Sequence, residues 1–352
     1  MEEKKKTARE IIEGYDGPPV RIMEVCGTHT HEIFRLGIRK LLPEQVELIS
    51  GPGCPVCVTQ VGFIDEAICL ALERQVTICT FGDLVRVPGT NMSLAGAREK
   101  GAKIRIVYSP VDAKEYAKEH PKEQVTFLSV GFETTTPSAC LSVKKAREEG
   151  LTNYSILTAN KTMPQAYEAL KGSADIFLYP GHVNAITGTK LCEELAKEGV
   201  SGVVAGFTAK ELLTALAVAL ARFQEGRPFF VNCYPRVVTE NGSPQAQKLV
   251  EEMMEPCDSE WRGLGVIKGS GMRLQEEWSA FDARKKYKIP PIQGKANPAC
   301  RCGDVLQGKC KPSDCKVFGK VCTPQHPVGA CMVSGEGACS AYYMYGEAEK
   351  MK

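Results

Sequence analysis

Residues 125–149 read VTFLSVGFETTTPSACLSVKKAREE, and this stretch shows the pattern that decides the fold. A short run rich in β-branched and aromatic residues, Val125–Val130, leads into a turn that begins at Gly131, and an amphipathic stretch, Pro137–Glu149, follows. The first run is typical of a buried strand and the last of a helix. A strand followed directly by a helix is the unit from which parallel sheets are built.

The same alternation continues from Val20 to about Ile267, which predicts an α/β protein with parallel sheets. The predicted strands are Arg21–Cys26, Val46–Ile49, Val76–Phe81, Lys103–Tyr108, Val125–Val130, Tyr154–Ala159, Asp175–Leu178 and Gly202–Ala205. The helical stretches between them are Glu32–Leu42, Val61–Glu73, Pro137–Glu149, Gln165–Leu170, Lys190–Lys197 and Ala209–Gln224. So many strands indicate two α/β units, with one large sheet as the alternative.

The composition changes after Lys285. The stretch PPIQGKANP at 290–298 is typical of a linker, and the sequence from there to Tyr345 is rich in Gly, Cys and Pro with little apolar content. Such a segment needs covalent or metal cross-links to hold one shape. We therefore expect an N-terminal extension at 1–19, a first α/β domain at 20–118, a second at 119–285 and a Cys-rich domain at 286–352.

Charge and hydropathy exclude several classes of partner. The 352 residues include 44 Lys and Arg against 42 Asp and Glu, a net charge of +2, so we expect no nucleic-acid surface. The longest mainly apolar run, Leu212–Phe223, is shorter than the roughly 20 residues that cross a bilayer, so we expect no membrane span. The charged N-terminus lacks the apolar stretch of a secretory signal, which predicts a cytoplasmic protein.

Cysteine is the unusual residue, because the chain has 16 and they are concentrated between Cys300 and Cys339. In a reducing compartment, cysteines more often bind metals or carry redox chemistry than form structural disulfides. Four thiolates can hold a 4Fe-4S cluster or a zinc ion. The paired C-x-x-C knuckles of zinc sites are absent from this segment, so its spacing favours iron and sulfide over zinc. Disulfides or buried free thiols are the structural alternative.

A second cysteine site lies in SGPGCPVCVT at 50–59. Here a C-x-x-C pair, Cys54 and Cys57, follows a predicted strand and opens a helix. A thiol at a helix N-terminus has a lowered pKa and is a better nucleophile, which predicts thioredoxin-like redox chemistry. Half of a zinc site is the alternative.

A third candidate site lies in IMEVCGTHTHE at 22–32, where a predicted strand delivers Cys26 and His29 to one turn. Thiolate and imidazole suit iron, copper or zinc, and the same pair could act as a nucleophile with its base. A buried Cys26 with His29 capping the helix is the structural alternative.

Two further strand ends carry chemistry-bearing side chains, Glu133 in GFETTTP and His182 in YPGHV. Each alone is compatible with an ordinary helix cap. Together with Cys26 they place Cys, His and Glu at successive strand ends, which is how an active cleft is built in an α/β protein. No G-x-G-x-x-G follows the first strand and no P-loop motif occurs, which counts against a dehydrogenase or a nucleotide-binding enzyme.

The combination of MEVCGTHTH, GPGCPVC, GFETTTP, PGHV and the Cys-rich tail, in that order, resembles the HypD family of hydrogenase maturation factors over essentially the whole chain. The resemblance implies two Rossmann-like α/β units and a small C-terminal domain with a 4Fe-4S cluster. It also implies a scaffold that assembles the Fe(CN)2CO part of the nickel-iron hydrogenase site. The implied partners are the small protein HypC, the cyanide donor HypE with HypF upstream, and indirectly the hydrogenase large subunit.

Carried onto this chain, the resemblance implies that Cys26 holds the iron, transiently bound as Fe or Fe(CN)2CO, jointly with HypC and close to His29. Cys54 and Cys57 become the redox pair. We expect the cluster ligands to be Cys302, Cys315, Cys322 and Cys331, with Cys339 as a substitute. Such a protein is a redox-active assembly factor, and we leave open whether Glu133 and His182 act on ligands or hold turns.

Two other functions remain compatible with the residues. In the first, a stand-alone iron-sulfur-dependent oxidoreductase uses the Cys54–Cys57 pair on a disulfide or thiol substrate. In the second, the Cys-rich tail binds zinc and the protein is a binding module without electron chemistry.

Overall fold

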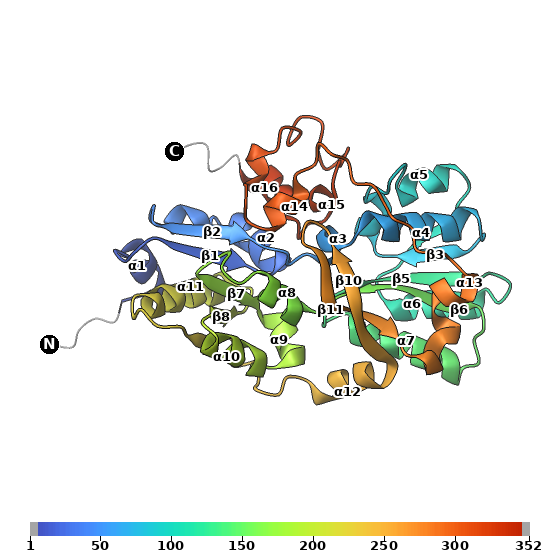
Figure 1. The fold of residues 1–352 in the computed structure, drawn as a ribbon, viewed down its shortest axis with the longest axis horizontal. Coiled ribbons are helices and arrows are strands. Elements are labelled where there is room, and N and C mark those ends of the chain that lie inside the picture. Colours follow the sequence, from blue (N-terminus) through green and yellow to red (C-terminus); the bar gives the residue numbers. More distant parts are fainter. Residues whose placement is uncertain (1–5, 347–352) are drawn as a thin grey trace.

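The computed structural model describes residues 6–346, in which two parallel β-sheets form neighbouring lobes (Figure 1). The Cys-rich C-terminal segment lies across one side of both lobes, and a long β-hairpin stands between them. The predicted extension 1–19 and the predicted Cys-rich domain 286–352 each include residues outside the described range. Among the described residues, no helix is long and apolar enough to cross a membrane.

The first lobe is built on a five-stranded sheet in the order β2-β1-β7-β8-β9, with every neighbouring pair parallel. Its strands are β1 (Val20–Glu24), β2 (Val46–Ser50), β7 (Ile176–Pro180), β8 (Ser201–Ala205) and β9 (Phe230–Asn232). One face packs against α1 (Ala8–Glu13), α2 (Gly27–Arg35) and α11 (Ala209–Phe223). The other face packs against α8 (Met163–Ala169), α9 (Gly181–Thr187) and α10 (Lys190–Lys197).

The second lobe is built on a four-stranded parallel sheet in the order β4-β3-β5-β6. Its strands are β3 (Thr77–Thr80), β4 (Ile104–Ile106), β5 (Val125–Gly131) and β6 (Tyr154–Asn160). Helices α4 (Val61–Leu72) and α5 (Leu94–Glu99) cover one face, and α6 (Pro110–Glu119) and α7 (Thr136–Glu148) cover the other. The two central strands, β3 and β5, are buried along their whole length, as expected for a parallel sheet with helices on both faces.

The remaining elements connect and cover the lobes. The hairpin consists of antiparallel β10 (Met254–Trp261) and β11 (Gly265–Leu274), preceded by α12 (Pro244–Met253) and followed by α13 (Ala283–Tyr287). The Cys-rich segment contains α14 (Cys302–Leu306), α15 (Ala330–Val333) and α16 (Ala338–Tyr345). Short helices are α3 (Pro55–Val58), η1 (Ile38–Leu41), η2 (Gly82–Arg86), η3 (Glu276–Phe281) and η4 (Pro312–Asp314).

The eight predicted strands are all present, and the prediction of an α/β protein with parallel sheets is confirmed. Two separate parallel sheets form instead of one large one. The predicted helix Glu32–Leu42 differs, because α2 begins five residues earlier at Gly27 and a left-handed Gly37 (φ 66°) separates it from η1. Three strands, β9 to β11, have no counterpart in the prediction, since β10 and β11 lie largely on the surface and lack a buried apolar run.

The sheets divide the chain differently from the predicted boundary between residues 118 and 119. The second lobe takes β3 and β4 from before that boundary and β5 and β6 from after it, while β7 to β9 return to the first lobe. The chain therefore crosses between the lobes at α3 and again between β6 and α8. Strand pairing is a long-range choice, so local sequence patterns define the strands without defining their partners.

A buried carboxylate network fixes the end of β1. Glu24 is fully buried, and its carboxylate accepts hydrogen bonds from Thr30 Oγ1 (2.7 Å), Ser50 Oγ (3.3 Å) and Arg39 Nη2 (2.6 Å). Arg39 also donates to the Leu48 carbonyl at 2.7 Å. These bonds tie β1, β2, α2 and η1 together immediately before the turn that carries Cys26.

Replacing Arg39 by Ala removes the cation that pairs with Glu24 and leaves a buried charge. We expect the free energy of unfolding to fall by about 3–5 kcal/mol, the cost of breaking a buried ion pair. Urea unfolding followed by circular dichroism measures it. The matched control is Arg9→Ala, which removes the exposed Arg9–Glu13 pair and should cost no more than about 1 kcal/mol. Equal effects of the two substitutions would contradict the role given to Arg39.

Candidate functional site

A backbone contact joins the Cys26 turn to the Cys54 turn. Because β1 and β2 are parallel neighbours with Glu24 paired to Ser50, the turns that follow them leave the sheet side by side. The Gly27 amide donates to the Gly53 carbonyl at 3.0 Å. A Cβ atom on Gly53 would lie only 2.2 Å from the Cys26 nitrogen, so this position accepts only glycine. Two of the predicted sites therefore lie side by side.

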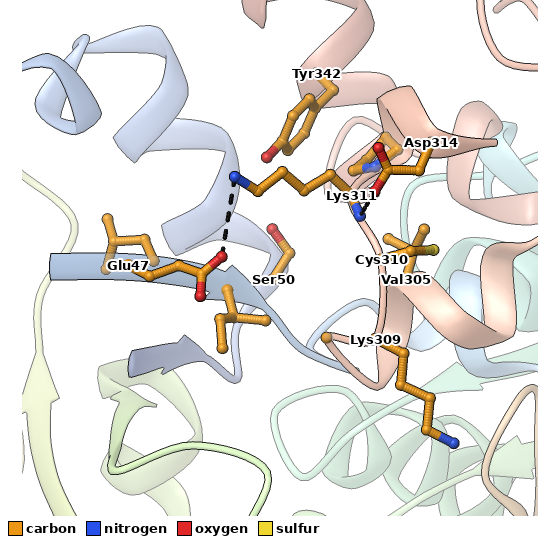
Figure 2. Close-up of a pocket in the computed structure, with 12 residues that line it drawn as sticks. Glu47, Ser50, Val305, Lys309, Cys310, Lys311, Asp314 and Tyr342 are labelled. Atoms are coloured by element: carbon orange, nitrogen blue, oxygen red, sulfur yellow. Dashed lines mark hydrogen bonds and ion pairs between the residues drawn. The ribbon is translucent and has the colours of Figure 1, made fainter. Parts of the chain in front are cut away.

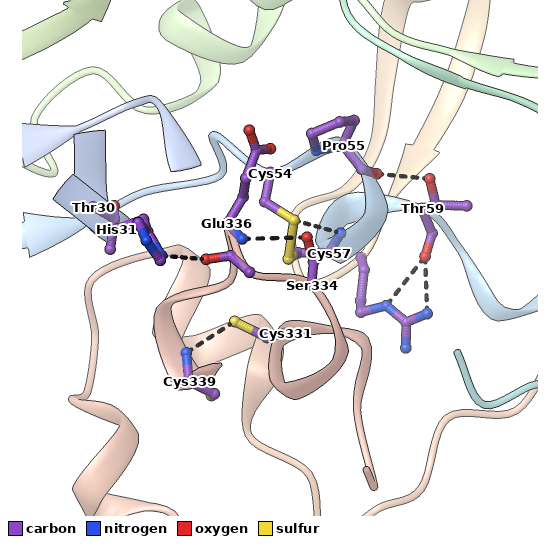
Figure 3. The surroundings of a disulfide bond; sticks show 12 residues. Thr30, His31, Cys54, Pro55, Cys57, Thr59, Cys331, Ser334, Glu336 and Cys339 are labelled. Carbon is purple, nitrogen blue, oxygen red and sulfur yellow. Dashed lines mark hydrogen bonds between the residues drawn. A yellow bond between two sulfur atoms is a disulfide. The ribbon is translucent and has the colours of Figure 1, made fainter. Parts of the chain in front are cut away.

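Cys54 and Cys57 form a disulfide at the start of α3 (Figure 3). Cys54 is the N-cap of this helix, as predicted, and its sulfur also accepts a hydrogen bond from the Cys57 amide at 3.1 Å. Both residues are buried, with 2% and 0% of their surface exposed. The bond therefore lies inside the protein, beneath the Cys-rich segment.

Cys26 lies at the N-cap of α2, and its sulfur is 4.0 Å from His182 Nδ1 at the start of α9. Burial raises the pKa of Cys26 to about 12, and the carboxylate of Glu336 adds to the rise. Burial also lowers the pKa of His182 to about 4. At neutral pH the pair is therefore a thiol beside a neutral imidazole.

His29, one turn into α2, is fully buried in the same region. Its Nε2 is 3.0 Å from the Gly206 carbonyl, and a carbonyl only accepts, so this nitrogen carries the proton. Burial, with a smaller effect of His182, lowers its pKa to about 3. Its Nδ1 is buried and has no hydrogen-bond partner. A neutral imidazole with one nitrogen fixed as a donor and the other free is the form that binds metals.

Phe207 packs against both imidazoles, with ring centroids 4.9 Å from His29 and 5.1 Å from His182. It follows β8, so three neighbouring strand ends of the first lobe, those of β1, β7 and β8, supply this part of the site. The position of His182 beside Cys26 agrees with the expectation that strand ends form one cleft.

Glu133 belongs to the second lobe, immediately after β5. Its Oε1 accepts a hydrogen bond from the Met163 amide at 2.8 Å, while Oε2 is buried without a partner. Burial raises the pKa of Glu133 to about 7, against hydrogen bonds that lower it. Met163 is the first residue of α8, so the carboxyl group of Glu133 lies where the chain returns to the first lobe.

Sequence reasoning missed Tyr167, on α8. The side chain is 2% exposed, and its hydroxyl is buried without a hydrogen-bond partner. It belongs to the apolar cluster that contains Val25, Cys54 and Cys57. A tyrosine at a helical core position carries no sequence signal that separates it from ordinary packing.

The tail cysteines gather around one small apolar pocket. It is lined by Cys300, Cys302, Cys315, Cys322, Cys331 and Cys339. Cys310 instead lines a different pocket between β2 and the Cys-rich segment, where Lys311 pairs with Glu47 at 3.9 Å (Figure 2). Sequence spacing could not separate Cys310 from the others.

The chemistry of this pocket suits a thiolate-bound cluster. The Cys339 amide donates to Cys331 Sγ at 3.3 Å and the Val328 amide to Cys322 Sγ at 3.4 Å. Amide donors aimed at sulfur are what stabilise cluster thiolates. As the side chains stand in residues 6–346, no three of them are already arranged to hold a single metal ion. The thiols that line the pocket are of the residue type that holds iron-sulfur clusters, and their side chains would need to turn toward one.

The Cys-rich segment packs against the disulfide (Figure 3) and also contacts the turn that follows Cys26. Thr28 Oγ1 donates to Glu336 Oε1 at 2.8 Å, and His31 Nδ1 lies 3.1 Å from the Gly335 carbonyl. A Cβ on Gly27 would lie 2.5 Å from the Cβ of Glu336. The segment between Cys331 and Cys339 is therefore the cover of the site.

The hairpin tip joins the same parts from the other side. The Arg262 guanidinium donates twice to the Thr59 carbonyl, at 3.1 and 2.9 Å, just after α3. Next to it, a Cβ on Gly263 would lie 2.3 Å from the Cα of Gly303 in α14. One turn of the hairpin thus contacts both the disulfide helix and the Cys-rich segment.

Comparison with known proteins identifies a family that matches nearly the whole chain. The sequence model of HypD, described as "Hydrogenase formation hypA family", matches residues 2–346. The chain belongs to the HypD family. A Cupriavidus necator protein named "Hydrogenase maturation factor HypD" is 42% identical over 347 residues, covering 95% of this chain and 92% of that protein. The Escherichia coli protein of that name is 43% identical over 339 residues, with coverages of 94% and 90%.

Membership of the HypD family confirms the resemblance seen in the motifs. The motifs that carried it lie together in the structure: Cys26, the Cys54–Cys57 disulfide and His182 occupy one region, and Glu133 approaches it from the second lobe. The relatives cover nearly the full chain, so the match extends through the Cys-rich segment as well.

Replacing Glu133 by Gln tests the buried carboxyl. Its pKa is raised from 4.5 to about 7 in the folded protein, so between these values the unfolded chain ionises while the folded chain holds its proton. The stability of the unmodified protein must therefore fall as pH rises through this window. We expect Glu133→Gln to be near neutral at pH 4 and stabilising, on the order of 3 kcal/mol, at pH 8.

Urea unfolding at the two pH values measures the difference. The exposed Glu148, replaced by Gln, is the matched control and should change stability little at either pH. An effect of Glu133→Gln that does not depend on pH would contradict a raised pKa.

Proposed function

We propose that this protein is a hydrogenase maturation scaffold that holds iron at Cys26 while the Fe(CN)2CO centre of nickel-iron hydrogenases is assembled. Family membership supports the general role. The contact of the Cys26 turn with the Cys54 turn carries the specific proposal, because it places a potential iron ligand beside a redox-capable pair.

Iron enters the proposal as cargo. A thiol with a pKa near 12 is protonated until a cation arrives, so binding of Fe(II) would release the Cys26 proton. His182 Nδ1, 4.0 Å from the Cys26 sulfur, is a neutral imidazole nitrogen beside the proposed ligand, and the Nδ1 of His29 is buried without a hydrogen-bond partner. Cys26, with His29 close by, would thus hold the iron jointly with the small partner.

The thiols of the tail pocket would hold a 4Fe-4S cluster. We propose Cys302, Cys315, Cys322 and Cys331 as ligands and Cys339 as a substitute, and Cys300 lines the same pocket. Such a cluster, when bound, supplies single electrons. The chain itself supplies the Cys54–Cys57 couple, whose reduction to two thiols takes two electrons and two protons.

The proposed partners are HypC, which would share the iron, HypE as cyanide donor with HypF upstream, and indirectly the hydrogenase large subunit. We place the work in the cytoplasm. A redox-active assembly factor describes the protein better than an enzyme acting on a free substrate.

A stand-alone disulfide oxidoreductase fits the geometry less well. Such an enzyme presents its attacking sulfur to a substrate, and reactive cysteines are partly exposed. Cys54 and Cys57 are 2% and 0% exposed and lie under the segment around Glu336. Their position suits exchange within the protein.

Replacing Cys26 by Ala should abolish the binding of the iron that carries cyanide and CO, and should leave the cluster and the fold intact. The chain is produced anaerobically with its HypC partner, and infrared spectra are recorded in the region of cyanide and CO stretching. We expect these bands to fall to background while the visible absorbance of the cluster stays. The control is Cys140→Ala, which removes a buried thiol on the far face of the second lobe. Full bands in Cys26→Ala would overturn the assignment.

Replacing Cys302 by Ser should remove the cluster, because this thiol is 4% exposed and lines the proposed pocket. We expect cluster-bound iron and sulfide to fall several-fold after anaerobic reconstitution. Cys310→Ser is the matched control, since Cys310 lies outside the pocket, and it should bind the full amount. Stoichiometric zinc with no sulfide in the unmodified protein would favour the zinc-binding module.

A further inference from the structure

A groove between the second lobe and the C-terminal part of the chain is lined by basic side chains. Its volume is about 660 Å³. The basic residues that line it are Arg86, Arg262, Lys295 and His326. Among the described residues that line the groove, none is Asp or Glu. The whole chain carries a net charge of only +2, so this excess of positive charge is a local property of the groove.

The two arginines of the groove are anchored by carbonyl groups. Arg86 Nη1 donates to the Pro324 carbonyl at 2.7 Å, and the Arg262 guanidinium donates to the Thr59 carbonyl. A carbonyl group holds a guanidinium in place without neutralising its charge. Both arginines therefore keep a full positive charge at the groove.

The third cation, Lys295, is held through its backbone. Its amide donates to Thr90 Oγ1 at 2.8 Å, while its side chain is exposed. The carboxylate of Asp65 accepts hydrogen bonds from the amide and the hydroxyl of the same threonine, at 2.8 and 2.6 Å, and lines a neighbouring pocket. The side chain of Lys295 is thus free to meet a charged partner.

One wall of the groove touches the thiols of the tail pocket. Val328 lines the groove, and its amide donates to Cys322 Sγ at 3.4 Å. Asn297 also lines the groove, and its carbonyl accepts a hydrogen bond from the Cys300 amide at 3.0 Å. Next to Val328, a Cβ on Gly329 would lie 2.5 Å from Cys300 Sγ. A molecule bound in the groove would therefore lie across this wall from the tail thiols.

The arrangement of the cations favours a large partner over a small anion. A site for a small anion brings several donors together on one group, whereas Arg86, Lys295 and His326 are exposed and come from three separate segments of the chain. Exposed charges of one sign that are spread over a surface act at long range. They steer a protein of opposite charge into place and orient it.

We propose that this groove is the docking surface for the acidic face of a one-electron carrier protein, which reduces the cluster proposed for the tail pocket. The inference rests on the proposed function, because it gives the place where electrons enter the protein. One electron leaves the reduced carrier and enters the cluster. The carrier is thereby oxidised by one electron and the cluster is reduced by one.

Replacing Lys295 by Glu reverses one charge of the groove at an exposed side chain. The probe is an oxidised plant-type ferredoxin with an acidic surface, titrated by calorimetry into the cluster-loaded chain. We expect the Kd at low salt to rise on the order of tenfold. The difference should shrink as salt is raised to about 1 M, where the screening length is about 3 Å. In stopped-flow measurements with reduced ferredoxin below saturation, reduction of the cluster should slow by a similar factor.

The matched control is Lys210→Glu, which makes the same change of charge at an exposed residue of α11, outside the groove. It should leave the Kd unchanged. If Lys295→Glu does not fold, Arg86→Gln tests the same groove, because Gln removes the charge and keeps a donor for the Pro324 carbonyl. This variant should also weaken binding at low salt.

The outcomes separate this inference from the proposed function. An unchanged Kd in Lys295→Glu, or equal weakening in Lys210→Glu, would overturn the inference and leave the proposed function standing. Binding of inorganic phosphate in the groove without any binding of ferredoxin at low salt would do the same, since it indicates a site for a small anion. Absence of iron and sulfide from the unmodified protein would overturn the proposed cluster and this inference with it.

Discussion

The contact between Gly53 and the Cys26 backbone is the constraint on which the site depends. It lets the turns after two neighbouring strands approach to backbone distance, and any side chain at residue 53 would push them apart. The buried Glu24–Arg39 network fixes the strand end from which the Cys26 turn leaves. Because both turns also begin helices, the two cysteines are placed by the rigid sheet and not by flexible loops.

Burial then determines the protonation state of the side chains that lie around these two turns. Low polarity disfavours charge, so Cys26 holds its proton, His29 and His182 lose theirs, and Glu133 titrates near neutral pH. All four groups are therefore uncharged or nearly so in the absence of a ligand. A cation entering this region changes that balance, since it favours the thiolate and is favoured by it. If iron binds Cys26 as proposed, its binding would therefore be coupled to the release of a proton.

Much of this could be predicted from the sequence, because the decisive signals are local. Eight strands follow from short apolar runs, and Cys26, Cys54, Glu133 and His182 are recognisable since each follows such a run. The interleaving of the two sheets could not be predicted, because strand pairing depends on contacts between residues far apart in sequence. The choice of Cys300 over Cys310 for the tail pocket depends on the path of a segment with little regular structure.

The chain passes from the first sheet to the second and back again, and these two crossings explain why residues of both lobes meet at one place. The chain leaves the first lobe through α3, which carries the disulfide, and returns between β6 and α8, where Glu133 binds the Met163 amide. The crossings are therefore parts of the site and not merely connections beside it.

Any motion of one lobe against the other would strain the disulfide helix and the Glu133 contact together. The Cys-rich segment and the hairpin tip both oppose such motion, because the segment contributes Cys302 and Leu306 to one core and Ala330 and Val333 to the other. The same covalent path that builds the fold thus keeps the thiols, imidazoles and carboxyl group at fixed distances.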